Sequence, residues 1–417
     1  TPSLDVLKAI LDGSGDREVS TTMVYVRILS QLLKDKDLGS RIVPIVPDEA
    51  RTFGMEGLFR QLGIYSSVGQ LYQPVDKGQV MYYKEDVKGQ LLEEGITEAG
   101  AMSSWIAAAT SYSHYNQPML PFYSFYSMFG FQRIGDLAWA SGDMRARGFL
   151  MGGTAGRTTL NGEGLQHEDG HSHILAGTIP NCHTYDPAYG YEMAVIIREG
   201  IHQMMELQQD RFYYITMMNE AYQQPAMPQQ EHIERDIIRG MYLLEEDKRT
   251  AKLHVQLLGS GTILLEVREA AKILRDEFGV GADVWSVTSF NELRRDGLDV
   301  ERWNRLHPRE EPRLSHIETC LQGRQGPVVA STDYMKLYAD QVRQWVPQAT
   351  YKVLGTDGFG RSDSRKKLRD FFEVDRHWVT LAALEALVKE GLLDVQVLVD
   401  AIEKFGIDVN KPNPLDC

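Results

Sequence analysis

The chain has 417 residues, of which 43% are hydrophobic, and this predicts two or three domains with ordinary apolar cores. Its formal net charge of -14 argues against non-specific binding to nucleic acid, which requires clustered lysine and arginine. The three cysteines suit a reducing compartment, no apolar run is long enough to span a membrane, and no signal peptide is evident. We therefore expect a cytoplasmic protein without a nucleic-acid or membrane partner.

The first half of the chain alternates between helical and strand-like patterns. Residues 3–11 are typical of a short amphipathic helix, and Ser20 is expected to cap a helix that continues to Leu33. Residues 41–46 form an apolar strand, and the charged residues after it occupy the edge where open α/β sheets bind ligands. Residues 66–88 are polar and irregular, which is typical of a functional or mobile loop. Further helices are expected over 55–63, 134–146 and 188–207, and further strands over 119–126, 148–152, 178–185 and 212–218.

Residues 88–109 join an acidic, glycine-punctuated turn to a run of small and apolar residues. The alanines of this run favour a helix that packs closely against its neighbours. Glu98 stands at the expected first turn, where the helix dipole favours a carboxylate. Taken alone, the pattern is more typical of a core helix with an ordinary acidic first turn than of a functional site.

The second half begins after residues 223–235, which are rich in proline and glutamine and predict a linker with a domain boundary near residue 228. Strands that alternate with helices throughout predict an α/β protein of two domains, with mainly parallel sheets flanked by helices. The expected strands are 253–258, 284–287, 328–331 and 351–354, and the expected helices are 264–278, 335–345, 368–372, 378–390 and 394–405.

The glycine-rich loop over residues 161–173 carries three histidines, His167, His171 and His173. With Glu168, the first two match the HExxH zinc-protease pattern, which works only on a helix, where residues four apart share a face. Glycines before and inside the pattern argue against a continuous helix. Two alternatives remain, a polar loop with incidental histidines and an active-site loop that presents His167 to a substrate, since imidazole suits proton transfer near pH 7.

Two other glycine-rich turns follow strands. Residues 259–261 (Gly-Ser-Gly) resemble half of a dinucleotide-binding fingerprint, but Leu264 stands where the third glycine would be, so a plain turn between strand and helix is favoured. Residues 355–364 form the second turn. Both an anion site and a simple connection fit its sequence.

Several long segments together resemble one family, the thiamine-diphosphate-dependent pyruvate dehydrogenase (acetyl-transferring) component in its bacterial, single-chain, homodimeric form. Blocks of this length are far more specific than a short motif, and they extend over nearly the whole chain. The matching segments are PDEARTFGMEGLFRQLGIYS (47–66), YYKEDVKGQLLEEGITEAGA (82–101), FYSMFGFQRIGDL (125–137), GGTAGRTTLNGEGLQHEDGHSH (152–173), STDYMKLYADQVR (331–343) and LGTDGFGRSDSR (354–365).

The resemblance implies a thiamine-diphosphate-binding, transketolase-like fold with an N-terminal helix and linker (1–22), a pyrimidine-binding domain (23–227) and a transketolase-type C-terminal domain (228–417). It also implies thiamine diphosphate and Mg2+ as cofactors. The Gly-Asp-Gly motif ending in Asn, with which the family's first domain binds the diphosphate and Mg2+, is absent from this sequence. Because the chain also starts at Thr1, we expect the C-terminal half of the family's polypeptide, or a subunit that works with another chain. In either case the metal ligands are expected outside this half.

The resemblance assigns Glu98 as the glutamate that activates the cofactor. A carboxyl group hydrogen-bonded to the aminopyrimidine ring favours the tautomer whose imino nitrogen takes the thiazolium proton, and such proton transfer contributes about 10²–10⁴-fold to the rate. Apolar neighbours are expected to desolvate this carboxyl group and to favour its protonated form. Ile96 is expected to pack on the pyrimidine ring and Phe129 to stack on it.

Further site residues follow from the same resemblance. Tyr126 is expected to reach towards the substrate, and His167 is expected to hydrogen-bond the pyruvate carboxylate or the intermediate. Glu49 is assigned as a second catalytic carboxylate and Asp48 as a cofactor-binding residue. Residues 68–84 correspond to a mobile loop that orders over the intermediate, and its glycine and proline content fits such a lid.

The implied reaction is the oxidative decarboxylation of pyruvate with reductive acetylation of the lipoyl group on a dihydrolipoyl acetyltransferase component. The resemblance further implies a homodimer, because the cofactor lies between domains of different subunits in this family. Three alternatives stay open: another 2-keto acid dehydrogenase or transketolase-like activity, a zinc hydrolase that uses His167 and His171, and an assembly or docking module without catalysis.

Overall fold

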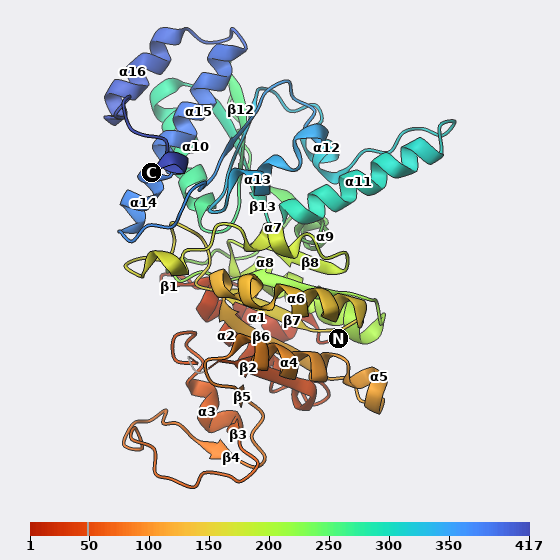
Figure 1. The fold of residues 1–417 in the computed structure, drawn as a ribbon. Coiled ribbons are helices and arrows are strands. Elements are labelled where there is room, and N and C mark those ends of the chain that lie inside the picture. The colour runs from red at the N-terminus through yellow and green to blue at the C-terminus, as the bar shows by residue number, and fades with distance from the viewer. Residues whose placement is uncertain (48–49) are drawn as a thin grey trace. The chain divides into compact units, whose positions relative to one another are not determined.

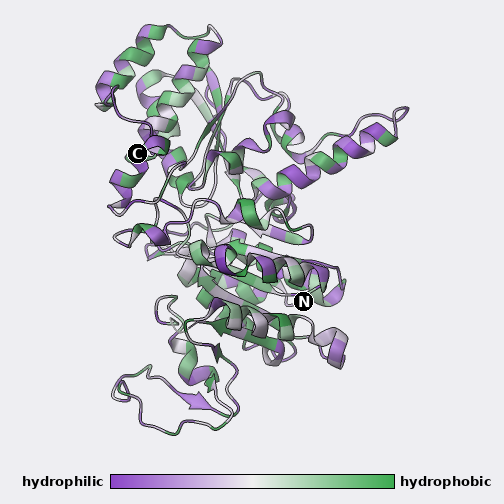
Figure 2. Ribbon diagram, in the orientation of Figure 1, coloured by the Kyte–Doolittle hydropathy of each residue, from purple (hydrophilic) through white to green (hydrophobic). Residues whose placement is uncertain are grey.

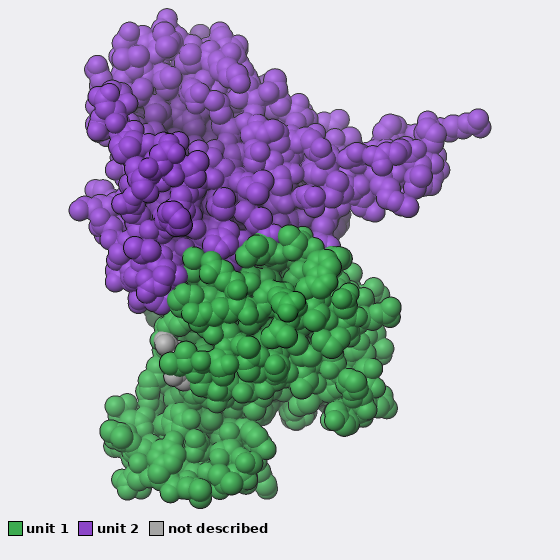
Figure 3. All heavy atoms as spheres, in the orientation of Figure 1, with its two compact units in different colours: residues 1–155, 175–185, 189–227 green, residues 156–174, 186–188, 228–417 purple. Residues whose placement is uncertain are grey.

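The computed structural model describes residues 1–47 and 50–417. They form two compact units, each of which combines segments that are distant in the sequence (Figure 3). Unit 1 consists of Thr1–Ala155, Leu175–Tyr185 and Tyr189–Met227, and unit 2 consists of Gly156–Ile174, Asp186–Ala188 and Pro228–Cys417. None of the described helices is both long and apolar enough to cross a lipid bilayer.

Unit 1 is built on a sheet of six strands in which every neighbouring pair is parallel (Figure 1). The strands read as continuous apolar runs because both faces of a parallel sheet are covered. In spatial order they are β5 (Leu92–Glu93), β2 (Ile42–Val46), β6 (Leu120–Tyr126), β7 (Phe149–Gly153), β9 (Phe212–Thr216) and β8 (Cys182–Tyr185).

Helices pack on both faces of this sheet, because successive side chains of a strand point in opposite directions. On β6, Tyr123 lies in an apolar core with Trp105 of helix α4, whereas its neighbour Phe122 contacts Tyr25 of helix α2. α6 packs against α4, and α8 packs against α2. The main helices of unit 1 are α1 (Lys8–Leu11), α2 (Thr21–Leu32), α3 (Gly57–Leu62), α4 (Glu98–Ala109), α5 (Ser111–Tyr115), α6 (Ser127–Asp143), α7 (Ser172–Ala176, shared with unit 2) and α8 (Gly190–Ile201).

The long loop of unit 1 leaves the sheet after β2 and returns to it at β5 (Figure 1). Its described residues include helix α3 and two short strands, β3 (Ile64–Tyr65) and β4 (Glu85–Asp86), which pair with each other. Arg51 ties the loop down, because its guanidinium forms an ion pair with Asp76 and donates a hydrogen bond to the carbonyl oxygen of Met81 (3.1 Å). None of residues 66–88 is buried, so this part of the loop is held by a few polar contacts rather than by a core.

Unit 2 contains a five-stranded sheet that is parallel except at one edge. The edge strand β11 pairs antiparallel with β13, and the remaining neighbours pair parallel. The spatial order is β11 (Met241–Glu245), β13 (Gly281–Val287), β12 (His254–Gly259), β14 (Val328–Ser331) and β15 (Tyr351–Leu354).

The helices of unit 2 include one that extends away from the sheet. This helix, α11, has 17 residues and is hydrophilic over most of its length (Figure 2). The others are α9 (Ile233–Arg239), α10 (Ile263–Phe278), α12 (His316–Leu321), α13 (Lys336–Asp340), α14 (Arg365–Phe371), α15 (Arg376–Lys389) and α16 (Val395–Phe405), and α11 itself covers Phe290–Leu306.

The predicted fold class is confirmed, since both units are α/β and their sheets are mainly parallel. The chain passes from unit 1 to unit 2 at Met227 and Pro228, close to the linker expected from the sequence. The short helix at 3–11 is a 3-10 turn (Leu4–Leu7) followed by α1, and Ser20 caps α2 by accepting a hydrogen bond from the backbone nitrogen of Met23 (3.2 Å).

Some element boundaries were wrong. α6 begins at Ser127 rather than at residue 134, because Gly130 lets the helix lie against the ring of Phe125, where an added Cβ would collide. The strand expected over 178–185 begins only at Cys182, since Pro180 has no N–H to donate to the sheet. The elements α9, β11, α11 and α12 were not predicted.

Candidate active site

The carboxyl end of β6 and the start of α4 in unit 1 bring together three of the predicted site residues, Glu98, Tyr126 and Phe129. Glu98 is the first residue of α4 and follows Thr97, whose hydroxyl caps the helix by accepting a hydrogen bond from the Gly100 nitrogen (3.2 Å). The backbone carbonyl of Glu98 accepts a hydrogen bond from the Tyr123 hydroxyl (3.4 Å). Its side chain is 14% exposed, so the carboxylate is positioned by the sheet yet remains reachable.

The nearest charged partner of Glu98 is Arg133 of α6, whose Nη1 lies 2.6 Å from Oε1 of Glu98. The sequence analysis expected only apolar neighbours for this carboxylate, whereas in the structure a half-exposed guanidinium also contacts it directly. The prediction missed Arg133 because α6 was expected to begin only at residue 134. With the helix starting at Ser127, Phe129 and Arg133 are four residues apart and share one face.

A row of aromatic side chains packs next to this ion pair. The guanidinium of Arg133 lies 4.3 Å from the ring centroid of Phe129, and Phe129 meets Tyr126 edge to face at 6.0 Å. Tyr126 in turn packs on Phe53, which follows β2 (5.5 Å between centroids). The structure thus brings Glu98, Phe129 and Tyr126 into one group.

Ile96 precedes α4 by two residues and is 75% exposed. An isoleucine this exposed, two residues before Glu98, suits contact with an apolar ring of a ligand. Asp48 and Glu49, the other two predicted residues at this edge, lie outside the residues that the structure describes.

A pocket of about 300 Å³ opens in unit 1 at the carboxyl ends of β2 and β5. Its wall combines the segment after β2, including Arg51 and Phe59, with Asp76 and Tyr83 of the long loop and Glu93 of β5. Phe59 and Tyr83 meet edge to face at 5.7 Å, and burial together with Glu93 and Glu85 raises the pKa of the Tyr83 hydroxyl. The loop over residues 66–88 therefore lines a cavity at the ligand-binding edge of the sheet.

His167 belongs to unit 2, at the end of a 3-10 turn (Leu165–His167). The next residue, Glu168, is extended (φ -84, ψ 100), so His167 and His171 do not share a helical face. The geometry required by the zinc-hydrolase alternative is absent. Among the described residues, no group of three or more His, Cys, Asp and Glu side chains could hold a metal ion.

The side chains beside Glu98 fit an aromatic heterocycle with a ring nitrogen. Glu98 offers a carboxylate for the nitrogen, and Phe129 and Ile96 offer apolar surface for the ring. The described part of the chain offers no comparable metal-ligand cluster for a diphosphate-bound cation.

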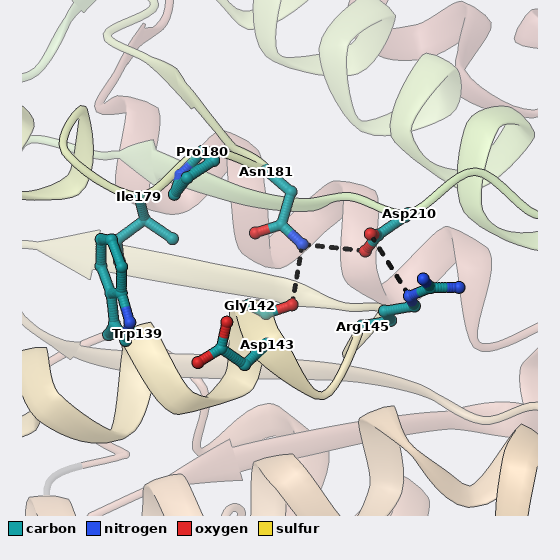
Figure 4. A pocket seen from close by; sticks show the side chains of 8 residues that line it. All are labelled: Trp139, Gly142, Asp143, Arg145, Ile179, Pro180, Asn181 and Asp210. Atoms are coloured by element: carbon teal, nitrogen blue, oxygen red, sulfur yellow. Dashed lines mark hydrogen bonds and ion pairs between the residues drawn. The ribbon is translucent and has the colours of Figure 1, made fainter.

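A second hollow of about 310 Å³ lies at the opposite edge of the unit 1 sheet (Figure 4). Asn181 and Asp210, which stand just before β8 and β9, are joined there by a hydrogen bond of 2.8 Å, and Trp139 and Arg145 complete the wall. It contains none of the predicted site residues, and ligands of open α/β sheets bind at the carboxyl ends of the strands.

Two protein-family models match the chain. Residues 3–225 match the family model described as pyruvate dehydrogenase E1 component middle domain. Residues 240–375 match the model described as transketolase-like TK C-terminal domain.

The chain is similar to complete proteins of the same description. It is 77% identical over 416 residues to the pyruvate dehydrogenase E1 component of Pseudomonas aeruginosa and 61% identical over 414 residues to that of Escherichia coli K12. The matches cover 100% and 99% of this chain but only 47% and 46% of the relatives, so the chain spans about half their length.

Solved structures with the same fold are transketolases. The enzyme from Leishmania mexicana matches with a TM-score of 0.66 at 14% identity, over 90% of this chain and 46% of that chain. The enzyme from Campylobacter jejuni matches with a TM-score of 0.63 at 18% identity, over 91% of this chain and 50% of that chain.

Proposed function

Because the chain belongs to the pyruvate dehydrogenase E1 component family, we propose that the protein containing it decarboxylates pyruvate oxidatively. In this proposal the acetyl group passes to the lipoyl group of a dihydrolipoyl acetyltransferase partner. The observation that carries the proposal is the position of Glu98, at the start of α4 and beside Phe129, Arg133 and the exposed Ile96.

Thiamine diphosphate would supply the nucleophile and the electron sink that decarboxylation requires. Within this chain, Glu98 would hold a proton at a ring nitrogen of the aminopyrimidine, while Phe129 and Ile96 would hold the two faces of that ring. Arg133 would keep the Glu98 carboxylate oriented, since an Arg–carboxylate hydrogen bond is directional.

The remaining predicted residues would act on the substrate. Tyr126 would reach towards pyruvate from the end of β6, and His167 would donate a hydrogen bond to its carboxylate. Glu49 would provide a second catalytic carboxylate and Asp48 a contact to the cofactor. The loop that lines the pocket would close over the bound reactants and exclude water, as lids of this composition do.

The other half of the family's polypeptide would complete the site. Residues 23–227 would bind the pyrimidine, residues 228–417 would form the C-terminal domain, and the diphosphate and Mg2+ would bind outside this chain. A homodimer in the cytoplasm follows from the same proposal, because each cofactor would need pyrimidine-binding and diphosphate-binding domains from different subunits.

Ferricyanide-coupled oxidation of pyruvate by the longest native form of the protein tests the proposal. The assay is run with and without thiamine diphosphate and Mg2+, beside Glu98→Ala. We expect turnover that requires the cofactor and that disappears in the variant, while circular dichroism shows the fold unchanged. Cofactor-dependent turnover at the normal rate in Glu98→Ala would refute the role of this residue, and no turnover in the folded, cofactor-loaded protein would refute the reaction.

A further inference from the structure

The segment over residues 156–174, which carries His167, is held inside unit 2 at two places. The first is the carboxyl end of β14, where the fully buried Asp333 follows the strand. Its carboxylate accepts hydrogen bonds from the backbone nitrogen and the hydroxyl of Thr158 (2.8 and 2.7 Å) and from the hydroxyl of Thr159 (2.5 Å). Side chains of the same unit thereby fill the crevice between the ends of β12 and β14, where sheets of this topology bind ligands.

The second place is the glycine-rich segment 355–365. The guanidinium of Arg157 is 4% exposed and donates hydrogen bonds to the carbonyl oxygens of Thr356 (2.7 Å) and Gly358. From the other side, Nε of Arg365 donates to the carbonyl oxygen of Thr159 (2.7 Å). Each of the two segments, 156–174 and 355–365, therefore contributes one arginine that donates hydrogen bonds to backbone carbonyls of the other segment.

The contact closest to His167 is made by its neighbour Glu168. Oε2 of Glu168 accepts a hydrogen bond from the backbone nitrogen of Arg361 (2.6 Å). A Cβ added at Gly360 would collide with the carbonyl oxygen of Leu165 and lie 3.0 Å from Cβ of Glu168. The two segments approach each other so closely that only glycine fits at position 360.

We propose that the glycine-rich segment 355–365 is the support that fixes His167 in its working position, and that Glu168 is the positioning residue through which it acts. The proposal rests on the proposed function, because only there does His167 contact the substrate. Glu168 is bonded directly to His167 along the chain, so a displacement of Glu168 moves the backbone of His167 as well.

The charge on Glu168 bears on this role. Burial raises the pKa of its carboxyl group to about 8, against the opposing effects of the Arg361 N–H and the Arg157 guanidinium, and the Asp333 carboxylate adds to the rise. Asp169 and Asp357 act in turn on Arg157. The remaining titratable and charged groups of the two segments are Glu163, His167, His171, His173, Arg361, Asp363 and Arg365. Near pH 7 the side chain of Glu168 is thus mainly a neutral acid.

A neutral acid has a close substitute in glutamine. Glutamine keeps the oxygen that accepts from the Arg361 amide and places an NH2 donor where the acid carries its proton. Oε1 of Glu168 is buried and makes no hydrogen bond with the residues that the structure describes. An NH2 group at this position in glutamine therefore replaces no hydrogen bond seen in the structure. Glu168→Gln is therefore expected to keep His167 in place, whereas Glu168→Ala removes the bond to Arg361.

The experiment uses the longest native form of the protein and compares Glu168→Gln, Glu168→Ala and Gly360→Ala with wild type. Glu311→Ala, at an exposed position of unit 2, is the matched control. The rate at which diethyl pyrocarbonate modifies His167, followed by mass spectrometry, reports its position without cofactor or turnover. Pyruvate oxidation supplies kcat, KM and their pH dependence.

We expect Glu168→Ala and Gly360→Ala to change the modification rate of His167 and to lower kcat about 10²-fold, the usual effect of displacing a catalytic group by about 1 Å. Thiamine diphosphate affinity should stay normal in both, because unit 1 is untouched. Glu168→Gln should keep most of the activity at pH 6.5. It should also lack the fall in activity that we expect of wild type as Glu168 ionises near pH 8.

Two results overturn the support role. The first result is that Glu168→Ala and Gly360→Ala keep the wild-type kcat and the wild-type rate of His167 modification, although His167→Ala lowers kcat. The other is a Glu168→Gln variant as impaired as Glu168→Ala. If Glu168→Ala does not fold, Glu168→Asp, which withdraws the carboxyl group from the Arg361 amide, is held to the same criteria. Absence of pyruvate oxidation in wild type would count against the proposed function alone, since the modification rate of His167 would still test the support.

Discussion

The Nη1 atom of Arg133 lies 2.6 Å from the Oε1 atom of Glu98, and the same guanidinium lies 4.3 Å from the ring centroid of Phe129. A side chain from α6 therefore links the first residue of α4 to an aromatic ring that would face a ligand. The arrangement fixes the direction of a carboxylate whose side chain is still 14% exposed.

Glu98→Gln is expected to fold normally and to lose about 10²–10⁴-fold in kcat, because an amide cannot exchange a proton with a ring nitrogen as a carboxyl group does. Steady-state pyruvate oxidation at saturating thiamine diphosphate measures the loss. Glu94→Gln, at the carboxylate bonded to Ser104, is the control that removes a nearby acid from the same segment. Equal losses in both variants would contradict a special role for Glu98.

Arg133→Met is expected to lower the free energy of unfolding by less than about 1 kcal/mol, because half-exposed ion pairs contribute little to stability. Its effect on kcat should be larger, about 10-fold, since the Glu98 carboxylate loses the group that orients it. Urea unfolding and pyruvate oxidation on the same preparation separate the two effects. A loss of stability with unchanged kcat would show that Arg133 serves the fold only.

Asp76→Asn is expected to loosen the long loop of unit 1, because Asp76 pairs with Arg51 and its carboxylate accepts a hydrogen bond from the Tyr83 nitrogen (3.1 Å). The global unfolding transition should change little, since the loop contributes few residues to the core. Limited proteolysis should cut within residues 66–84 several times faster than in wild type. Asp37→Asn, on an exposed turn before β2, is the control that should leave the cleavage rate unchanged.

Glu168 should make stability depend on pH in a defined direction. The folded protein holds this proton up to about pH 8, whereas the unfolded chain releases it near pH 4.5, so the free energy of unfolding falls as pH rises between these values. Glu168→Gln removes the effect and should be more stable than wild type at pH 8.5 by on the order of 1–3 kcal/mol, with little difference at pH 5. Urea unfolding at both pH values checks this. If the free energies of unfolding of wild type and Glu168→Gln differed by the same amount at both pH values, the raised pKa of Glu168 would be contradicted.

The alternation of apolar strands and helices was enough to predict the α/β class and most element positions, because both sheets are buried on two faces. The 17-residue helix α11 was not predicted because it is hydrophilic over most of its length and only Phe290, Asn291, Leu293 and Gly297 are buried. One signal was present: Ser289 caps the helix by accepting a hydrogen bond from the Glu292 nitrogen (2.9 Å), a serine followed three residues later by glutamate.

The candidate site was predictable only where long segments resembled a family. Glu98, Tyr126 and Phe129 were named on that basis, and they lie in one group in unit 1. Arg133 was missed because its role depends on where α6 begins. The function of segment 355–365 was left open, because contacts such as Arg361 to Glu168 join residues nearly two hundred positions apart, and no local pattern encodes them.

The discontinuity of unit 2 has a consequence for how the protein is made. Residues 156–174 leave the ribosome long before Asp333, Gly360 and Arg361, with which they pack. The hydrogen bonds of this segment to Asp333 and Arg361 therefore form only after the C-terminal sheet has been synthesised. We expect a polypeptide that ends at Met227 to lack these contacts, so that limited proteolysis cuts within residues 156–174 faster than in the full chain.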